Sequence, residues 1–420
     1  MLQTIRNIFK IEDLRKRIIY TLLMLALVRL GALIPSPLMN AEVVKTYFAS
    51  ANSVMQLFDI MSGNAFSQMN LFAMGITPYI NSSIIISLLT VAIPKLQELQ
   101  EEGESGRKKI TQYTRYLTIV LALIQSFGIS FGLRSVFTSE LGVAWSIIVS
   151  MAVFTAGSMF TMWIGETITE NGIGNGISLI IMVNVLSRVP ALISQISGYG
   201  KWWLSVIIAV VLLFMCAFIV VLELAERRVP IQYAKRMQGR KVYGGNSTFI
   251  PIRVNMAGVI PIIFAVSIMS MPSIITGFIT SNPTGWWGAA LKWLNTGHPF
   301  GACLYLVLII FFTYFYASIT YNPREIADNL KKNGGFIPGI RPGAPTSDYL
   351  KKTSKYVITI GAVMLAIIAI FPILLQFIFG IDNLSISGSS LMIAIGVALE
   401  TVKQIESQMV MRHYKGFLSE

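Results

Sequence analysis

The feature that most constrains this chain of 420 residues is a series of long apolar segments. A helix needs about 20 mostly apolar residues to cross roughly 30 Å of hydrocarbon, and such segments recur along the whole sequence. Only 13% of the residues are charged, whereas about 25% are charged in a typical soluble protein. The sequence therefore predicts an all-α membrane protein with ten transmembrane helices. The predicted spans are Ile18–Pro35, Gly75–Pro94, Tyr116–Val136, Trp145–Gly165, Gly176–Ile196, Trp203–Leu224, Met256–Phe278, Ala302–Tyr321, Tyr356–Phe379 and Ser390–Met411.

The basic residues are distributed unevenly between the two sides of these spans. With the N-terminus in the cytoplasm, 26 of the 33 Lys and Arg residues fall in cytoplasmic segments. Because retained Lys and Arg orient multi-span proteins, we expect both termini to be cytoplasmic. Arg29 lies inside the first span, where a charge needs a partner or a route to the interface. We expect it to snorkel outward or to form a structural ion pair.

Ten spans divide into two halves of five, residues 1–200 and residues 201–420. Because five is an odd number, the second half must enter the membrane from the opposite side. Inverted halves of this kind place a functional pathway near the bilayer midplane, where they meet. The expectation of an inverted repeat rests on the number of spans.

The outer segment between the first two spans, about residues 54–66, reads VMQLFDIMSGNAF. It is apolar enough for a short helix but too short to cross a bilayer. Such a helix either re-enters the protein interior or lies flat at the membrane interface. The pattern alone does not choose between these two placements.

Two predicted cytoplasmic loops, about residues 223–254 and 322–355, are long and basic. Long loops in compact proteins are often functional. We expect these loops to form docking surfaces for an acidic partner, such as ribosomal RNA, a motor protein or anionic phospholipid. Candidate docking residues within them are Arg240, Lys241 and Arg324.

The second predicted span combines polar residues with a regular aliphatic pattern. Asn81 and Ser82 would be costly against lipid, so their face should look toward other helices or a water-filled cavity. Ile76, Ile80 and Ile84 repeat every four residues and therefore share one face of a helix. Ordinary helix packing is the commonest reason for this spacing. The functional alternative is a hydrophobic constriction that gates a pore by dewetting.

Signatures of catalysis are missing from the sequence. Glu166 and Glu170 precede a glycine-rich segment, which favours a tight turn over acid–base chemistry or cation binding. No phosphate-binding loop, zinc-protease motif or nucleophile elbow occurs. Cys216 and Cys303 both fall within predicted spans. We therefore expect no enzymatic activity, no metal site and no cofactor.

Several motifs identify a family resemblance. In chain order they are residues 75–86 (GITPYINSSIII), 101–116 (EEGESGRKKITQYTRY), 171–178 (NGIGNGIS), 254–261 (VNMAGVIP), 322–330 (NPREIADNL) and 338–343 (PGIRPG). Together they resemble the SecY family of protein-conducting channels over essentially the whole chain. The resemblance implies a central hourglass pore between the two halves, narrowed by an aliphatic ring. Position by position, the ring would comprise Ile76, Ile80, Ile84, Ile181, Val185, Ile263 and Ile393.

The resemblance also assigns the segments around the ring. Residues 54–66 would be a re-entrant plug helix, contributing Leu57, Phe58, Ile60, Met61, Ser62 and Gly63. A lateral gate would run between the second and seventh spans, at Ser83, Ser87 and Asn255. Ser87 departs from the glutamine often found in the family, which alters the polarity of the gate. Arg341 matches the loop arginine that engages the driving partner.

The implied setting is the bacterial cytoplasmic membrane. The implied partners are the small membrane subunits SecE and SecG, the SecA ATPase and the ribosome. The implied substrates are secretory and membrane proteins, moved without any cofactor. The alternatives are a secondary transporter of a small solute, which would need polar groups at the midplane, and an intramembrane enzyme.

Overall fold

The computed structural model describes most of the chain. The described residues are 11–37, 68–132, 137, 142–190, 194, 202–233, 236–238, 241–243, 247–279, 285–294, 298–379 and 388–416. The expected plug, residues 54–66, lies outside them, with its residues Leu57, Phe58, Ile60, Met61, Ser62 and Gly63. Arg240 also lies outside the described residues.

Ten apolar helices in the described part of the chain overlap the ten predicted spans. They are α2 (Glu12–Gly31), α5 (Thr77–Ala92), α7 (Glu104–Gly132), α8 (Val143–Asn171), α9 (Gly176–Leu186), α11 (Trp202–Leu224), α12 (Ile260–Ile279), α14 (Pro299–Thr320), α16 (Ala344–Phe379) and α17 (Gly388–Gly416). Three short helices accompany them, α6 (Pro94–Glu101), α13 (Trp286–Leu294) and α15 (Pro323–Lys332).

Length and hydropathy alone would assign fewer spans. Five of the described helices are long and apolar enough to cross a membrane, or six if α5 and α6 count as one bent span. Several helices also extend beyond the predicted edges, as where α7 begins at Glu104 and α16 at Ala344. The reason is that hydropathy marks the part of a helix that lies in lipid, while the helical backbone continues into water.

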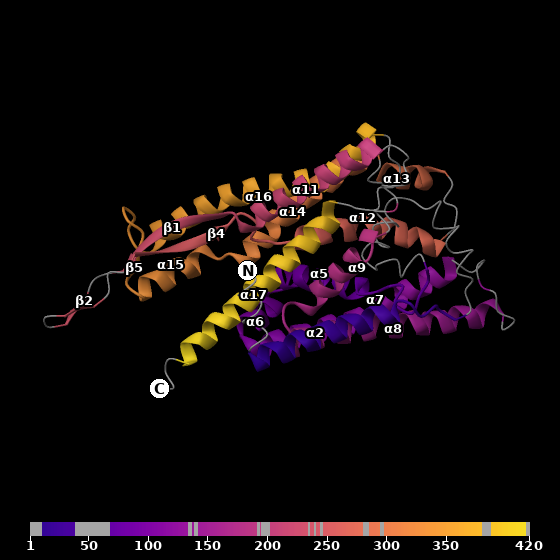
Figure 1. Cartoon of the computed structure of the whole chain (residues 1–420), viewed down its shortest axis with the longest axis horizontal. Helices are drawn as coiled ribbons and strands as arrows, with labels where there is room; N and C mark the ends of the chain where they lie inside the picture. The colour runs from indigo at the N-terminus through magenta and orange to yellow at the C-terminus, as the bar shows by residue number, and fades with distance from the viewer. Residues whose placement is uncertain are drawn as a thin grey trace.

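The two halves of the chain form neighbouring layers (Figure 1). Helices α2, α5, α7, α8 and α9 lie together in one layer, and α11, α12, α14 and α16 lie in the other. Helix α17 runs between the layers, where it packs against α9 as well as α11 and α16. Helix α12 contacts α7 and, less extensively, α5. The contact between the halves is therefore made by α5, α7 and α9 on one side and by α12 and α17 on the other.

A small sheet joins the two long loops, which the sequence analysis did not anticipate. Strand β1 (Glu226–Tyr233) pairs antiparallel with β4 (Ser247–Arg253), and β5 (Gly335–Phe336) pairs with the far end of β1. Strands β2 (Arg236–Gln238) and β3 (Lys241–Tyr243) form a separate two-stranded ribbon. Val229 and Ile252 of the larger sheet are buried against Leu350 and Val357 of α16. The fold remains mostly helical, and the strands lie at one end of it (Figure 1).

Candidate functional site

The seven predicted ring residues lie in one hydrophobic cluster between the halves. Each has at most 9% of its surface exposed, although the residues come from four different helices or their caps. The members are Ile76, Ile80 and Ile84 from the start of α5 onward, Ile181 and Val185 from α9, Ile263 from α12 and Ile393 from α17. The structure therefore brings together residues that are more than 300 positions apart in the sequence.

Local features of the sequence place α5 in this cluster. Gly75 adopts φ 51°, a conformation that favours glycine, and Pro78 stands in the first turn of the helix. The Ser158 hydroxyl of α8 donates a 2.8 Å hydrogen bond to the Gly75 carbonyl. This hydrogen bond holds the start of α5 against α8. It therefore helps to orient the helix that carries Ile80 and Ile84.

A second set of contacts positions α9. The Asn175 side chain caps the helix by accepting hydrogen bonds from the backbone of Ile177 and Ser178. Gly176 packs so closely against α8 that a Cβ there would overlap the carbonyl oxygen of Gly165. The glycine-rich segment after Glu166 and Glu170 is therefore a tight turn that docks α9, as its composition predicts.

The aliphatic cluster extends beyond the seven residues. Ile164, Ile180 and Ile309 are fully buried members of it and join the predicted ring to the cores of the two halves. In this arrangement the aliphatic side chains fill the space between α5, α9, α12 and α17. The contacts show that the seven residues belong to one buried cluster, and their assignment as a pore ring stays a prediction.

The predicted gate residues divide into two groups. Ser83 and Ser87 of α5 are partly exposed, whereas Asn255 is 5% exposed and lies just before α12. The Asn255 amide nitrogen donates a 2.7 Å hydrogen bond to a carboxylate oxygen of Glu223 on α11. Asn255 is therefore held by its own half of the protein. The sequence analysis missed Glu223, because nothing in the local pattern marks it as the partner of Asn255.

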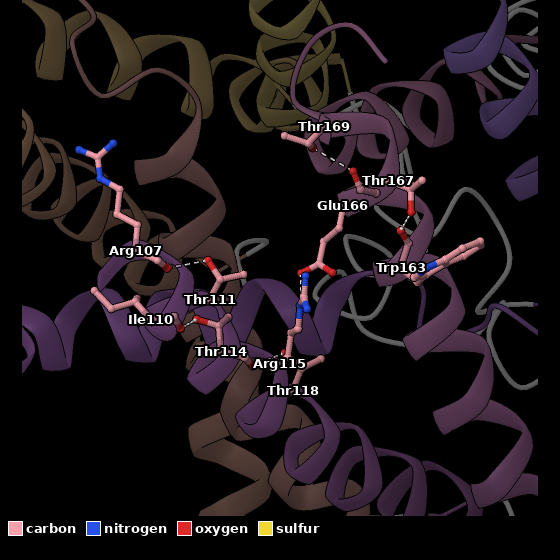
Figure 2. Close-up of polar contacts among 11 residues, drawn as sticks. Arg107, Ile110, Thr111, Thr114, Arg115, Thr118, Trp163, Glu166, Thr167 and Thr169 are labelled. Atoms are coloured by element: carbon pink, nitrogen blue, oxygen red, sulfur yellow. Dashed lines mark hydrogen bonds and ion pairs between the residues drawn. The ribbon is translucent and has the colours of Figure 1, made fainter. Parts of the chain in front are cut away.

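Two further polar pairs lie among the apolar helices. Arg29 of α2 donates to the Asn184 side chain of α9 at 3.2 Å, beside Val185 of the cluster. This pairing is a hydrogen bond to an amide, whereas snorkelling or an ion pair was expected. Figure 2 shows the second pair, in which Arg115 of α7 donates from Nε to a Glu166 oxygen of α8 at 2.9 Å.

Those predicted docking residues that the structure describes belong to elements at the end of the molecule that carries the strands. Arg324 is exposed in the first turn of α15, and Arg341 is exposed on the loop before α16. The Arg341 carbonyl accepts a 2.8 Å hydrogen bond from the Thr346 hydroxyl, which fixes that part of the loop. The backbone of Lys241 belongs to β3.

No group of three or more His, Cys, Asp or Glu side chains within the described residues is arranged to hold a metal ion.

Comparison with known proteins places the chain in a family. A family model described as SecY matches residues 70–402. The chain belongs to the SecY family. It is 44% identical to the protein translocase subunit SecY of Bacillus subtilis (strain 168), with 100% of both chains covered. It is 43% identical to the protein of that name from Thermotoga maritima, with 100% of this chain and 98% of the relative covered.

Solved structures of channels share the fold of this SecY family member. A structure described as that of a protein conducting channel matches with a TM-score of 0.65 and 16% identity, over 94% of this chain and 93% of the other. Canine Sec61 in a ribosome-channel complex matches with a TM-score of 0.60 and 14% identity, over the same shares. The predicted ten-helix membrane fold is thereby confirmed, and the protein is a multi-pass membrane protein.

Proposed function

We propose that this chain forms a protein-conducting channel of the bacterial cytoplasmic membrane, with both termini in the cytoplasm. It would pass unfolded secretory proteins across the membrane and release hydrophobic segments sideways into lipid. The observation that carries this proposal is the convergence of seven aliphatic side chains from α5, α9, α12 and α17 between the two halves. The 42–44% identity to bacterial translocase subunits over the full chain supports the same function.

An aliphatic constriction suits the transport of an unfolded chain. Each unpaired backbone amide would cost several kcal/mol in hydrocarbon, so a wet path between the halves lowers the barrier to crossing. Aliphatic side chains form no hydrogen bonds, so they can close around many different sequences without holding any of them. Between passages the same side chains exclude water and ions by dewetting. Selection then depends on how a segment partitions between the path and lipid, where Leu-like residues are favoured over charges.

A secondary transporter is the alternative that the fold class itself suggests. Such a transporter needs polar or charged groups around a midplane site. The cluster that the structure describes between the halves consists of aliphatic, methionine and aromatic side chains. The described polar pairs Arg29–Asn184 and Arg115–Glu166 each connect helices of the first half. The channel is therefore the better fit to the groups present.

The exposed basic residues at the strand-bearing end support docking of an acidic partner there. We propose that Arg324 and Arg341, together with Arg240 and Lys241, receive the SecA ATPase or the ribosome. The canine relative in fold is described in a ribosome-channel complex. SecE and SecG would contact the apolar outer faces of the helices, and anionic phospholipid would meet the basic loops.

Site-specific photocrosslinking tests the channel directly. A photoreactive residue replaces Ile80 of α5 or Ile263 of α12, and a secretory chain is stalled during translocation. We expect both positions to capture the stalled chain, because both side chains line the proposed path. The matched control is Leu213 of α11, whose side chain is 70% exposed on an apolar face and should capture lipid instead. Equal capture at all three positions, or none at Ile80 and Ile263, contradicts the proposal.

A further inference from the structure

Helix α13 is a short helix at the end of the molecule opposite the strands (Figure 1). Its nine residues extend over about 14 Å, so the helix is too short to cross a bilayer. Gly288 and Leu291 are buried on the side of the helix that packs against the protein. Trp286, Ala289 and Trp293 lie on the opposite side and are exposed. The surface formed by these three residues is termed the α13 face.

The α13 face presents two large aromatic side chains. Trp286 is 79% exposed and Trp293 is 57% exposed. They are seven residues apart, which places both indoles on the same side of the helix, two turns from each other. Exposed apolar patches on proteins mark contacts with other proteins or with membranes. We therefore expect something other than water to cover the α13 face.

The two neighbouring helices fix the direction in which the α13 face points. Trp287 donates a 2.9 Å hydrogen bond from Nε1 to the hydroxyl of Thr276 on α12, and Thr276 is 4% exposed. Trp293 stacks on the ring of His298, with centroids 5.3 Å apart and an angle of 19° between the planes. His298 Nδ1 in turn accepts a 3.3 Å hydrogen bond from the Phe300 amide and so caps α14. Helix α13 is thus attached to both α12 and α14.

The α13 face continues into an exposed apolar side of α14. The rings of Trp293 and Phe300 have centroids 6.1 Å apart. Phe300, Val307 and Phe311 share one side of α14 and are 52%, 62% and 57% exposed. Helix α14 is among the described helices that are long and apolar enough to cross a membrane, so this side of it meets lipid. The α13 face therefore begins where the lipid-facing side of α14 ends.

The chemistry of α13 favours the head-group layer over the hydrocarbon core. Tryptophan is enriched at membrane–water interfaces, because its ring is apolar and its N–H donates a hydrogen bond. Lys292 is exposed beside Trp293, and a lysine at this level can extend its ammonium group to phosphate. Trp203, at the start of α11, is 48% exposed at the same end of the molecule, since α11 leads into β1 at its other end.

We propose that the α13 face is a lipid-binding surface that lies in the phospholipid head-group layer and holds the link between α12 and α14 at that depth. The inference requires that the protein spans a membrane and does not depend on what passes through it. A second protein molecule is the competing occupant of the α13 face. The continuity with the lipid-facing side of α14 favours phospholipid.

Spin-label depth measurements on the whole protein in phospholipid vesicles test the proposal. Cys216 and Cys303 are replaced by alanine, and a nitroxide is attached through Ala289→Cys, which keeps both tryptophans of the α13 face. Collisions with oxygen report hydrocarbon, and collisions with a water-soluble nickel complex report water. Val307→Cys on α14 supplies the hydrocarbon reference, and Lys108→Cys on α7, where the lysine side chain is 74% exposed, supplies the water reference. We expect the ratio of the two collision rates at position 289 to lie between the references.

The contribution of the tryptophans is tested with the same label. Trp286→Ser combined with Trp293→Ser should raise the collision rate with the nickel complex at least about twofold, because water replaces the lipid that the indoles hold around the label. The matched control is Trp163→Ser on α8, which removes an indole that is 52% exposed on another helix and should leave the rate unchanged. If the double variant does not accumulate in the membrane, Trp286→Ser alone takes its place, because Trp286 is the more exposed of the two.

Three results at position 289 would contradict the proposal. The label could match the water reference, match the hydrocarbon reference or collide with neither reagent, and the last result would show that protein covers the α13 face. A rate that is unchanged by Trp286→Ser with Trp293→Ser, or equally changed by Trp163→Ser, overturns the role of the tryptophans. These depths are measured without translocation, so a failure of the proposed channel function would leave them unaffected.

Discussion

At the scale of single residues, two arginines within the helices form bonds to neighbouring helices. Arg29 joins α2 to α9 through Asn184, and Arg115 joins α7 to α8 through Glu166. A charge in an apolar environment is costly unless it is paired and hydrogen-bonded. Such pairs are therefore best placed where they fix the geometry of the helices that support the cluster.

The Arg115–Glu166 pair yields a stability prediction (Figure 2). The Glu166 side chain is only 14% exposed, whereas that of Arg115 is 43% exposed. Arg115→Ala leaves a largely buried carboxylate unpaired, so we expect a loss of about 1–3 kcal/mol of stability. The change should appear as a fall of several degrees in the midpoint of thermal unfolding in detergent.

The same helix offers a control for this prediction. Lys108 and Glu104 of α7 form a 3.0 Å ion pair whose side chains are 74% and 85% exposed. Pairs exposed in this way contribute little. Lys108→Ala should leave the unfolding midpoint unchanged. An equal fall in both variants would show that Arg115 contributes no more than a surface charge.

At the scale of helices, close approach at glycine helps to position the helices that carry the predicted ring residues. Gly176 allows α9 to pack closely against α8, because it has no Cβ. Its amide donates a 2.9 Å hydrogen bond to the Thr169 hydroxyl. Gly157 of α8 does the same for the segment before α5, since a Cβ there would overlap the Leu71 carbonyl oxygen. Both glycines lie at contacts that orient helices of the aliphatic cluster.

Gly176→Ala should therefore displace α9. The added methyl group would overlap the backbone of Gly165, and relieving that overlap in a packed site costs about 1–3 kcal/mol or more. We expect a lower unfolding midpoint and, because α9 carries Ile181 and Val185, a higher ion leak through the idle channel in planar bilayers. Gly103→Asn is the control, since Gly103 has open space around it and asparagine tolerates its φ of 84°. A wild-type leak and midpoint for Gly176→Ala would contradict the assigned contact.

Hydropathy and helix-breaking residues in the sequence predicted the positions of the helices. They did not predict the strands in the loops. Pro94 ends the second predicted span, and the structure bends by 101° between α5 and α6 at that point. The pairing of β1 with β5 was not predictable, because it joins two loops that are about a hundred residues apart and β5 is only two residues long. A strand that short has no periodic pattern, and its partner is chosen by the packing of α15 and α16.

The candidate site was predictable where it follows a repeat and unpredictable where it depends on one contact. The four-residue spacing of Ile76, Ile80 and Ile84 indicates that they share one helix face. The family resemblance supplies the other four predicted ring residues. The bond from Asn255 to Glu223 has no such pattern. The bond forms because the pairing of β1 with β4 brings Asn255 back beside the end of α11. The sequence alone does not show this proximity, because it depends on which strands pair.

At the scale of the whole molecule, the fold separates the predicted docking residues from the hydrophobic cluster between the halves. The strands and α15 lie at one end, α13 lies toward the other, and the ten apolar helices run between them (Figure 1). The sheet joins both long loops through the pairing of β1 with β5.

This separation allows docking to be impaired while the helical body stays intact. Arg341 is exposed, and its backbone carbonyl accepts a hydrogen bond from Thr346. This contact does not involve the charged guanidinium group. Arg341→Glu should therefore leave the amount of this protein in the membrane unchanged. Export of a secretory protein should fall at least roughly tenfold, because reversing the charge turns attraction to an acidic partner into repulsion. Lys292→Glu on α13 makes the same reversal at an exposed site on the other end and should export normally. Normal export by Arg341→Glu would remove this arginine from the docking surface, and an equal defect in Lys292→Glu would point to net charge instead of a specific contact.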